Sequence, residues 1–98
     1  MAQIIAGTFN AVGVSAVFVP STIRPAGFNI SIWGTFSGTV VVERSFDDGT
    51  TWLPKWPDAV YSISSPMSFS DSEPEDGVKY RLNCTSYSSG TINYRVSQ

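Results

Sequence analysis

Apolar residues recur at every second position along most of the chain. A period of two indicates β-strands that place one face on a hydrophobic core and the other toward solvent or a partner. Inward positions are expected in six segments: Val12, Val14, Ala16 and Phe18; Phe28, Ile30 and Ile32; Val40 and Val42; Met67 and Phe69; Val78, Tyr80, Leu82 and Cys84; Ile92, Tyr94 and Val96. No segment has the spacing of an amphipathic helix, so the sequence predicts an all-β protein.

Turn-forming residues separate these segments. Pro20–Gly27 and the acidic Asp71–Gly77 indicate loops, whereas Ser37-Gly38 and Ser88-Ser89-Gly90 are expected to form tight turns. Leu53–Asp58 carries two prolines and is expected to be an edge segment or a loop. About seven short strands at a spacing of roughly 8–12 residues describe an antiparallel β-sandwich.

The 98-residue chain is long enough for one domain. We expect residues 11–98 to form the sandwich and residues 1–10 to form an N-terminal arm. Arg24 is the first positively charged residue, so the N-terminus lacks the basic region of a secretory signal. No apolar run approaches the length of about 20 residues that a membrane span needs, and no membrane partner is expected.

The stretch from Asp76 to Tyr80 resembles the entry into the sixth strand of immunoglobulin-like and fibronectin-III-like domains. In those domains a tyrosine hydroxyl bonds back to the backbone at a corner, so Tyr80 is expected to contact backbone in or near residues 71–76. The resemblance implies an immunoglobulin-like or fibronectin-III-like sandwich. Cys84 is the single cysteine and lies four residues after Tyr80, which excludes an antibody-type disulfide.

Residues 45–52 read S-F-D-D-G-T-T-W. A glycine in this position accepts a positive φ, an aspartate can accept hydrogen bonds from the turn, and a tryptophan can fold over it. The pattern S-x-D-x-G-x-T-W resembles the Asp box, a hairpin that recurs in sialidase-type propellers and occurs singly in unrelated β-proteins. The resemblance implies structural roles, away from any active site, for five residues: Ser45, Asp47, Gly49, Thr51 and Trp52.

Charged residues make up only 14% of the chain, and the net charge is −2. So little charge indicates that part of the surface is covered by other copies or by a partner; a surface rich in serine and threonine is the alternative. The negative balance argues against nucleic acid as a partner.

The chain contains no histidine, which removes the commonest general base, nucleophile activator and metal ligand. Cys84 falls at an inward strand position and is expected to be a small buried hydrophobe. The acidic residues 71–76 lack the spacing of a calcium loop and are expected to form a solvated turn. Asp47 and Asp48 are adjacent and point apart, so they offer no facing carboxylate pair. We therefore expect no enzymatic activity, no cofactor and no metal.

Some residues are candidates for contact with a neighbouring molecule. Exposed aromatic side chains can stack on sugars or anchor a protein interface, whereas Trp56 is expected to cover one end of the sandwich. Ala11–Val19 has neither charge nor proline and is the candidate edge for pairing with another copy. The possible interface residues are Ile4, Ile5, Val17, Val19, Trp33 and Tyr87.

Two blocks of the chain occur in the order seen in small phage virion proteins with an immunoglobulin-like sandwich. The first is Phe28–Gly34 with Gly38–Gly49, and the second is Gly77–Thr85 with Ser89–Arg95. The chain is similar to these proteins in an extended G-T-V-x-x-x-R-S-F-D-G-G-x-T-W hairpin followed by Y-R-L-x-C-x-x-Y-x-S-G; Asp48 replaces the commoner glycine. The resemblance covers about two-thirds of the chain, from Phe28 onward.

This resemblance implies a non-enzymatic virion structural protein that is made in the host cytoplasm. The favoured role is a capsid decoration protein that binds a major capsid or other virion protein and associates with copies of itself, preferably as a trimer. A carbohydrate-binding β-sandwich of a fibre or surface protein, with a glycan as ligand, is the alternative.

Overall fold

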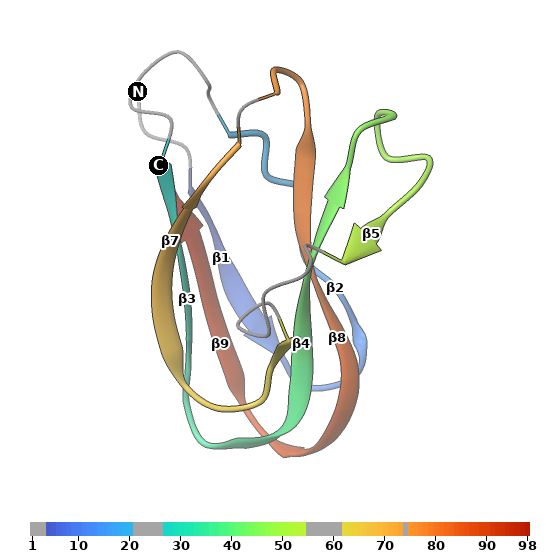
Figure 1. Cartoon of the computed structure of the whole chain (residues 1–98). Coiled ribbons are helices and arrows are strands. Elements are labelled where there is room, and N and C mark those ends of the chain that lie inside the picture. Colours follow the sequence, from blue (N-terminus) through green and yellow to red (C-terminus); the bar gives the residue numbers. More distant parts are fainter. Residues whose placement is uncertain (1–3, 21–26, 55–61, 74) are drawn as a thin grey trace.

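The computed structural model describes residues 4–20, 27–54, 62–73 and 75–98. Figure 1 shows two sheets that face each other across a core. The strands are β1 (Ile4–Phe9), β2 (Gly13–Val14), β3 (Gly27–Trp33), β4 (Phe36–Ser45), β5 (Leu53–Pro54), β6 (Ser62–Ile63), β7 (Met67–Ser72), β8 (Lys79–Gly90) and β9 (Ile92–Ser97). The all-β sandwich is confirmed, with nine strands in the described residues, three of which have only two residues. Within the same residues no helix is long and apolar enough to cross a membrane.

One sheet has four strands in the order β1-β9-β3-β7, and the other has five, in the order β2-β8-β4-β5 with β6 also paired to β4. The paired strands are antiparallel. In an immunoglobulin domain the last strand stays beside the strand before it. Here β9 leaves β8 and inserts between β1 and β3, so the immunoglobulin or fibronectin-III type is not confirmed. Gly90, with a φ of 90°, lies at this crossing, where a β-carbon would come within 2.1 Å of the Thr35 carbonyl oxygen.

The predicted alternation from residue 28 onward places its apolar members between the sheets. β3, β4, β8 and β9 each turn every second side chain inward, and Met67 and Phe69 of β7 pack against this core while half-buried. Burial of this set supplies most of the stabilisation of a small sandwich. The buried hydrophobic residues are Phe9, Phe18, Phe28, Ile30, Ile32, Val40, Val42, Ile63, Val78, Tyr80, Leu82, Cys84, Ile92, Tyr94 and Val96.

The N-terminal arm expected over residues 1–10 is wrong for its described part. Ile4–Phe9 form β1, which pairs with β9 along its whole length, from Ile4 opposite Ser97 to Phe9 opposite Ile92. Phe9 is only 6% exposed and stacks against Tyr94 with ring centroids 4.9 Å apart. The sandwich therefore includes these residues as an edge strand of the four-stranded sheet.

The single inward-facing strand expected over Ala11–Val19 is also wrong. Val12 is 62% exposed and Val14 is 52% exposed, whereas Phe18 is fully buried. Only Gly13–Val14 form a strand, and Phe18 makes an isolated bridge to Tyr80.

The inward position beside β8 is taken by Ser15. Its backbone N–H donates to the Leu82 carbonyl, and its hydroxyl oxygen accepts the Leu82 N–H, both at 2.9 Å. The next backbone bonds to β8 join Phe18 and Tyr80. Between the two bonded pairs the N-terminal segment has two residues, 16 and 17, whereas β8 has only Arg81. This extra residue resets the alternation, so Phe18 points inward and the valines before it do not.

The two tight turns expected at Ser37-Gly38 and at residues 88–90 are wrong as well, because β4 and β8 continue through them. Ser37 pairs with Ser89, and Gly38 pairs with Tyr87. The pairing of Thr39 with Ser86 followed by Val40 with Cys84 leaves one extra residue in β8. This bulge brings Tyr87 onto the core side, where it is half-buried and its hydroxyl donates to the Gly90 carbonyl at 2.6 Å.

Candidate functional site

The hairpin after β4 is closed by side-chain contacts of its own. The Ser45 hydroxyl donates to Asp47 Oδ1 at 2.8 Å and accepts the Gly49 N–H at 2.8 Å. Asp47 Oδ1 also accepts the Thr51 N–H at 2.7 Å, which confirms the prediction that this carboxylate holds the turn. Asp48 and Gly49 have positive φ values of 62° and 88°, so the turn needs the tolerance of aspartate and glycine.

The carboxylate of Asp47 accepts hydrogen bonds that hold the turn. The backbone N–H of Thr51, above all, lowers the pKa of this carboxyl, which therefore stays charged as an acceptor. The neighbouring Asp48 carboxylate contacts the Lys79 ammonium at 2.5 Å. The two aspartates therefore have different partners: Asp47 accepts the bonds of the turn, and Asp48 forms a surface ion pair.

Trp52 is half-buried beside this turn, close enough to Gly49 that a β-carbon there would lie 3.7 Å from the indole. The Arg81 guanidinium carbon lies 4.3 Å from the centroid of the Trp52 ring, a cation–π contact. Arg81 Nε also donates to Glu43 Oε1 at 2.7 Å, and Asn83 Nδ2 donates to Glu43 Oε2 at 3.1 Å. Trp52 is therefore part of an internal clasp, as the hairpin pattern predicts.

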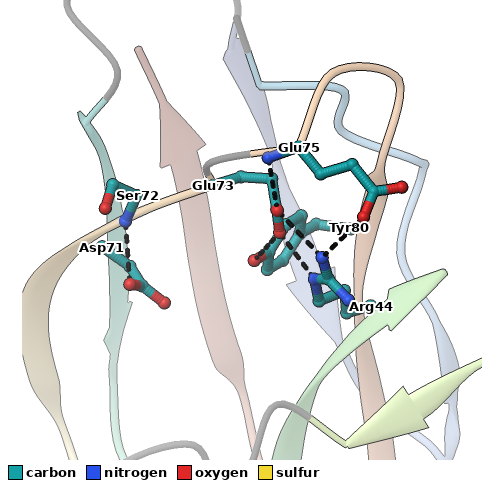
Figure 2. A network of polar contacts seen from close by, with 6 residues as sticks. All are labelled: Arg44, Asp71, Ser72, Glu73, Glu75 and Tyr80. Carbon is teal, nitrogen blue, oxygen red and sulfur yellow. Dashed lines mark hydrogen bonds and ion pairs between the residues drawn. The ribbon is translucent and has the colours of Figure 1, made fainter. Parts of the chain in front are cut away.

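A buried carboxylate joins the acidic loop to the two central strands of the five-stranded sheet (Figure 2). The Glu73 side chain is 1% exposed and accepts hydrogen bonds on both oxygens. Arg44 donates through Nε at 2.5 Å and through Nη2 at 2.9 Å. The Tyr80 hydroxyl donates at 2.8 Å, and the Glu75 N–H donates at 2.9 Å. The four donors compensate the cost of burying this charge.

These contacts fix the charge states of the network. Burial raises the pKa of Glu73, but the bonds from Arg44, the Glu75 N–H and Tyr80 outweigh it and hold the pKa at about 2. Burial and the bond to Glu73 raise the pKa of Tyr80 above its usual value. The bond to Glu73 likewise raises the pKa of Arg44. At neutral pH the network is a carboxylate held by a cation and a neutral phenol, with no group poised to exchange a proton.

One expectation is corrected by this network. The acidic stretch was expected to be a solvated turn, yet Glu73 within it is buried. Tyr80 reaches the expected loop, where its hydroxyl donates to the Glu73 side chain. The buried ion pair could have been predicted from Arg44. This residue follows Val40 and Val42 at the inward phase of β4, and an arginine that points inward requires an acidic partner.

The predicted interface residues divide into two groups. Ile4, Val17, Val19 and Trp33 are exposed by 52%, 44%, 37% and 47%. Ile5 and Tyr87 instead pack against the core. Trp56 lies outside the described residues.

Two exposed valines were missed, because Val12 and Val14 were placed inward. Together with Val17 and Val19 they form what we call the valine edge: Val12, Val14, Val17 and Val19, of which Val14 belongs to β2, the outer strand of the five-stranded sheet, and the others flank it in the chain. These valines are four of the eight exposed large hydrophobic residues among those described, and they lie within eight positions of the sequence.

The described residues contain no group of three or more histidine, cysteine or acidic side chains arranged to hold a metal. Cys84 is buried, its thiol donates to the Ser86 carbonyl at 3.4 Å, and burial raises the pKa of that thiol. Comparison with known proteins gives no match, whether to a protein-family model, a curated protein or a solved structure.

Proposed function

We propose that this protein is a non-enzymatic structural component of a phage virion, most directly a capsid decoration protein that is assembled onto the particle after synthesis in the host cytoplasm. The valine edge carries the proposal. Four exposed valines lie within eight residues at the outer edge of the five-stranded sheet, in a stretch from residue 4 to residue 20 that has no charged residue. Isolated domains often place charge on such edges, and this stretch has none. The short β2 and the extra residue at 16 and 17 limit backbone pairing, so the valine side chains are what this edge offers a neighbour.

The first partner that fits this edge is another copy of the chain. An uncharged apolar edge can pack on its own counterpart without burying an unpaired charge, and association removes it from water. A trimer is favoured because phage shells offer local three-fold positions, an argument from family analogy. The particle-side partner is then a major capsid protein or another virion protein.

Carbohydrate binding is the less favoured function. A sugar-binding sandwich of this type presents several exposed aromatic rings in one plane. Among the described residues the large exposed aromatics are Trp33 and Phe46, which belong to β3 in one sheet and to the turn after β4 in the other. The apolar edge therefore supports assembly better than this pair supports a glycan platform.

The proposal is tested by light scattering and by cosedimentation with particles assembled without the chain. The unmodified protein should form oligomers and sediment with the particles. The double variant Val14→Thr/Val17→Thr, which keeps β-branched residues at both positions, should melt normally yet become monomeric. Leu53→Ser, an equally exposed position on β5 at the opposite edge of the same sheet, is the matched control and should stay oligomeric. A monomeric unmodified chain that binds no particle would refute the proposal.

A further inference from the structure

The outer face of the four-stranded sheet is nearly free of charge. The pairing register places its residues in three rows across the strands. Because directly paired residues in antiparallel strands share a face, each row lies on the side of the sheet away from the core, although Ser97 in the first row is only 7% exposed. The rows are Ile4, Ser97, Asn29 and Ser70; Ala6, Arg95, Ser31 and Ser68; and Thr8, Asn93 and Trp33.

The other outer face of the sandwich is different. On the five-stranded sheet Glu43 pairs with Arg81, and Lys79 contacts Asp48. Its charges are therefore present and matched. Among the described residues the four-stranded face carries little charge, and serine, threonine, asparagine and alanine predominate on it. Lysine and the acidic residues are depleted at the centre of a protein interface, as serine and alanine are, whereas arginine and tryptophan are enriched there; an ordinary free surface carries mixed charges. The absence of lysine and acids from the three rows and the presence of Arg95 and Trp33 are therefore the features of this face that resemble an interface.

The two remaining large side chains on this face are Arg95 and Trp33. Arg95 is exposed in the central row, and its Nη1 donates to the Ser97 hydroxyl at 3.1 Å. Among the described residues no acidic side chain pairs with Arg95. Trp33 is 47% exposed at one end of the face. Arginine and tryptophan are the residue types that most often dominate binding energies.

A second copy of the chain does not suit this face. A two-fold axis through the sheet would bring the central Arg95 close to Arg95 of the other copy, and two like charges would be buried together. A partner with a carboxylate opposite Arg95 would instead complete a charge-assisted, two-point hydrogen bond.

We infer that the outer face of the four-stranded sheet docks on a protein surface of the particle, which presents a carboxylate to Arg95 and apolar contact to Trp33. The inference rests on the proposed function and assigns a different contact to each of two surfaces. The valine edge joins copies of the chain, and this face meets the particle. With strands about 4.8 Å apart and about 3.4 Å per residue, the face covers on the order of 400 Å². That is roughly half of the usual area per partner, so one copy binds weakly and an oligomer gains by avidity.

The test is cosedimentation of the full chain with particles assembled without it. Arg95→Glu and Trp33→Ser should each weaken particle binding about tenfold or more, since they remove the central charge and the aromatic anchor. Arg95→Lys should be intermediate, because it keeps the charge and loses the planar fork. Lys79→Glu changes the net charge as much as Arg95→Glu on the opposite face, and it should bind normally. Both Arg95 and Trp33 are exposed, so melting temperatures should stay near that of the unmodified chain.

The outcomes separate the inference from the proposed function. Normal particle binding by Arg95→Glu and Trp33→Ser, with binding by the unmodified chain intact, overturns the inference and leaves the proposed function standing. Absence of particle binding by the unmodified chain contradicts the proposed function, and the inference falls with it. Binding to purified host cell-surface polysaccharide that Arg95→Glu abolishes, with particle binding unchanged, would make this face a glycan site and would also overturn the inference.

Discussion

Arg44 and Glu73 form a two-point ion pair at one end of the sandwich, although 29 positions separate them in the sequence. The carboxylate is 1% exposed and the guanidinium side chain is 27% exposed. Burying such a pair costs solvation energy, which is recovered only when the remaining lone pairs are satisfied. Tyr80 and the Glu75 N–H supply those bonds, so the pair ties the acidic loop to β4 and β8.

The first prediction concerns the buried carboxylate itself. Glu73→Gln keeps the size of the side chain but leaves Arg44 without its charged acceptor, and it should lower the free energy of unfolding by about 1–3 kcal/mol. Urea denaturation measures this change. Glu75→Gln is the control: that carboxylate is 60% exposed and lies 3.8 Å from Arg44, so the cost should stay below about 0.5 kcal/mol. Equal effects of the two substitutions would show that the pair is not the anchor of the loop.

The second prediction is an acid-dependent loss of stability. The pKa of Glu73 is about 2 in the folded chain, below its usual 4.5, so the unfolded chain binds more protons between these values. The contribution of Glu73 is therefore complete above about pH 4.5 and is lost as the pH falls toward 2. Asp47 acts in the same direction, because its pKa is also lowered. Between pH 6 and pH 2 the melting temperature should fall less steeply with pH for Glu73→Gln than for the unmodified chain. The same pH dependence in both would contradict the assignment.

The third prediction isolates one hydroxyl. Tyr80→Phe keeps the buried ring, which contacts Phe28 at a centroid distance of 5.0 Å, and removes the hydroxyl that donates to Glu73. The free energy of unfolding should fall by about 1–2 kcal/mol, as for a hydrogen bond to a charged acceptor. Tyr87→Phe loses a bond to the exposed Gly90 carbonyl and should cost about 0.5 kcal/mol or less. An unchanged free energy of unfolding for Tyr80→Phe would mean that the corner contact does not stabilise the fold.

Sequence periodicity predicted the central strands well, because their inward residues are large, recur at every second position and are buried in the core between the two sheets. Ile30, Val42, Leu82 and Val96 all lie where the alternation places them. The turn of the hairpin at residues 45–52 was equally predictable, since the side-chain hydrogen bonds that close it lie within four positions along the chain.

Periodicity failed where an extra residue enters a strand. It also failed where two contacting residues are far apart in the sequence. The bulge in β8 reverses the side of Tyr87, and the irregular stretch at residues 16 and 17 does the same for Val14. Neither insertion has a local signature, because it depends on how the neighbouring strand pairs. The choice of Glu73 among several adjacent acids was likewise hidden, since only tertiary packing brings Arg44 to it.

The fourth prediction treats Asp47 as a folding residue. Asp47→Ala should lower the denaturation midpoint, because the Ser45 hydroxyl and the Thr51 N–H both lose their acceptor. Asp48→Gly is the matched control: it relieves a positive φ of 62° while losing a surface ion pair to Lys79, and the midpoint should hardly change. An unchanged midpoint for Asp47→Ala together with lost particle binding would make Asp47 a binding residue instead.

The last prediction follows from the pairing of β1. Deleting residues 1–10 removes a strand bonded to β9 along its length and takes Phe9, which is 6% exposed, out of the core. Loss of a buried phenylalanine alone costs about 3–5 kcal/mol, a large part of the stability of a small domain. The truncated chain should therefore be largely unfolded by circular dichroism, whereas a detachable arm would leave the melting curve intact. Ile4→Thr, at a position of β1 that is 52% exposed, keeps the strand and should melt close to the unmodified chain. A truncated chain that melts normally would show that β1 is dispensable to the sandwich.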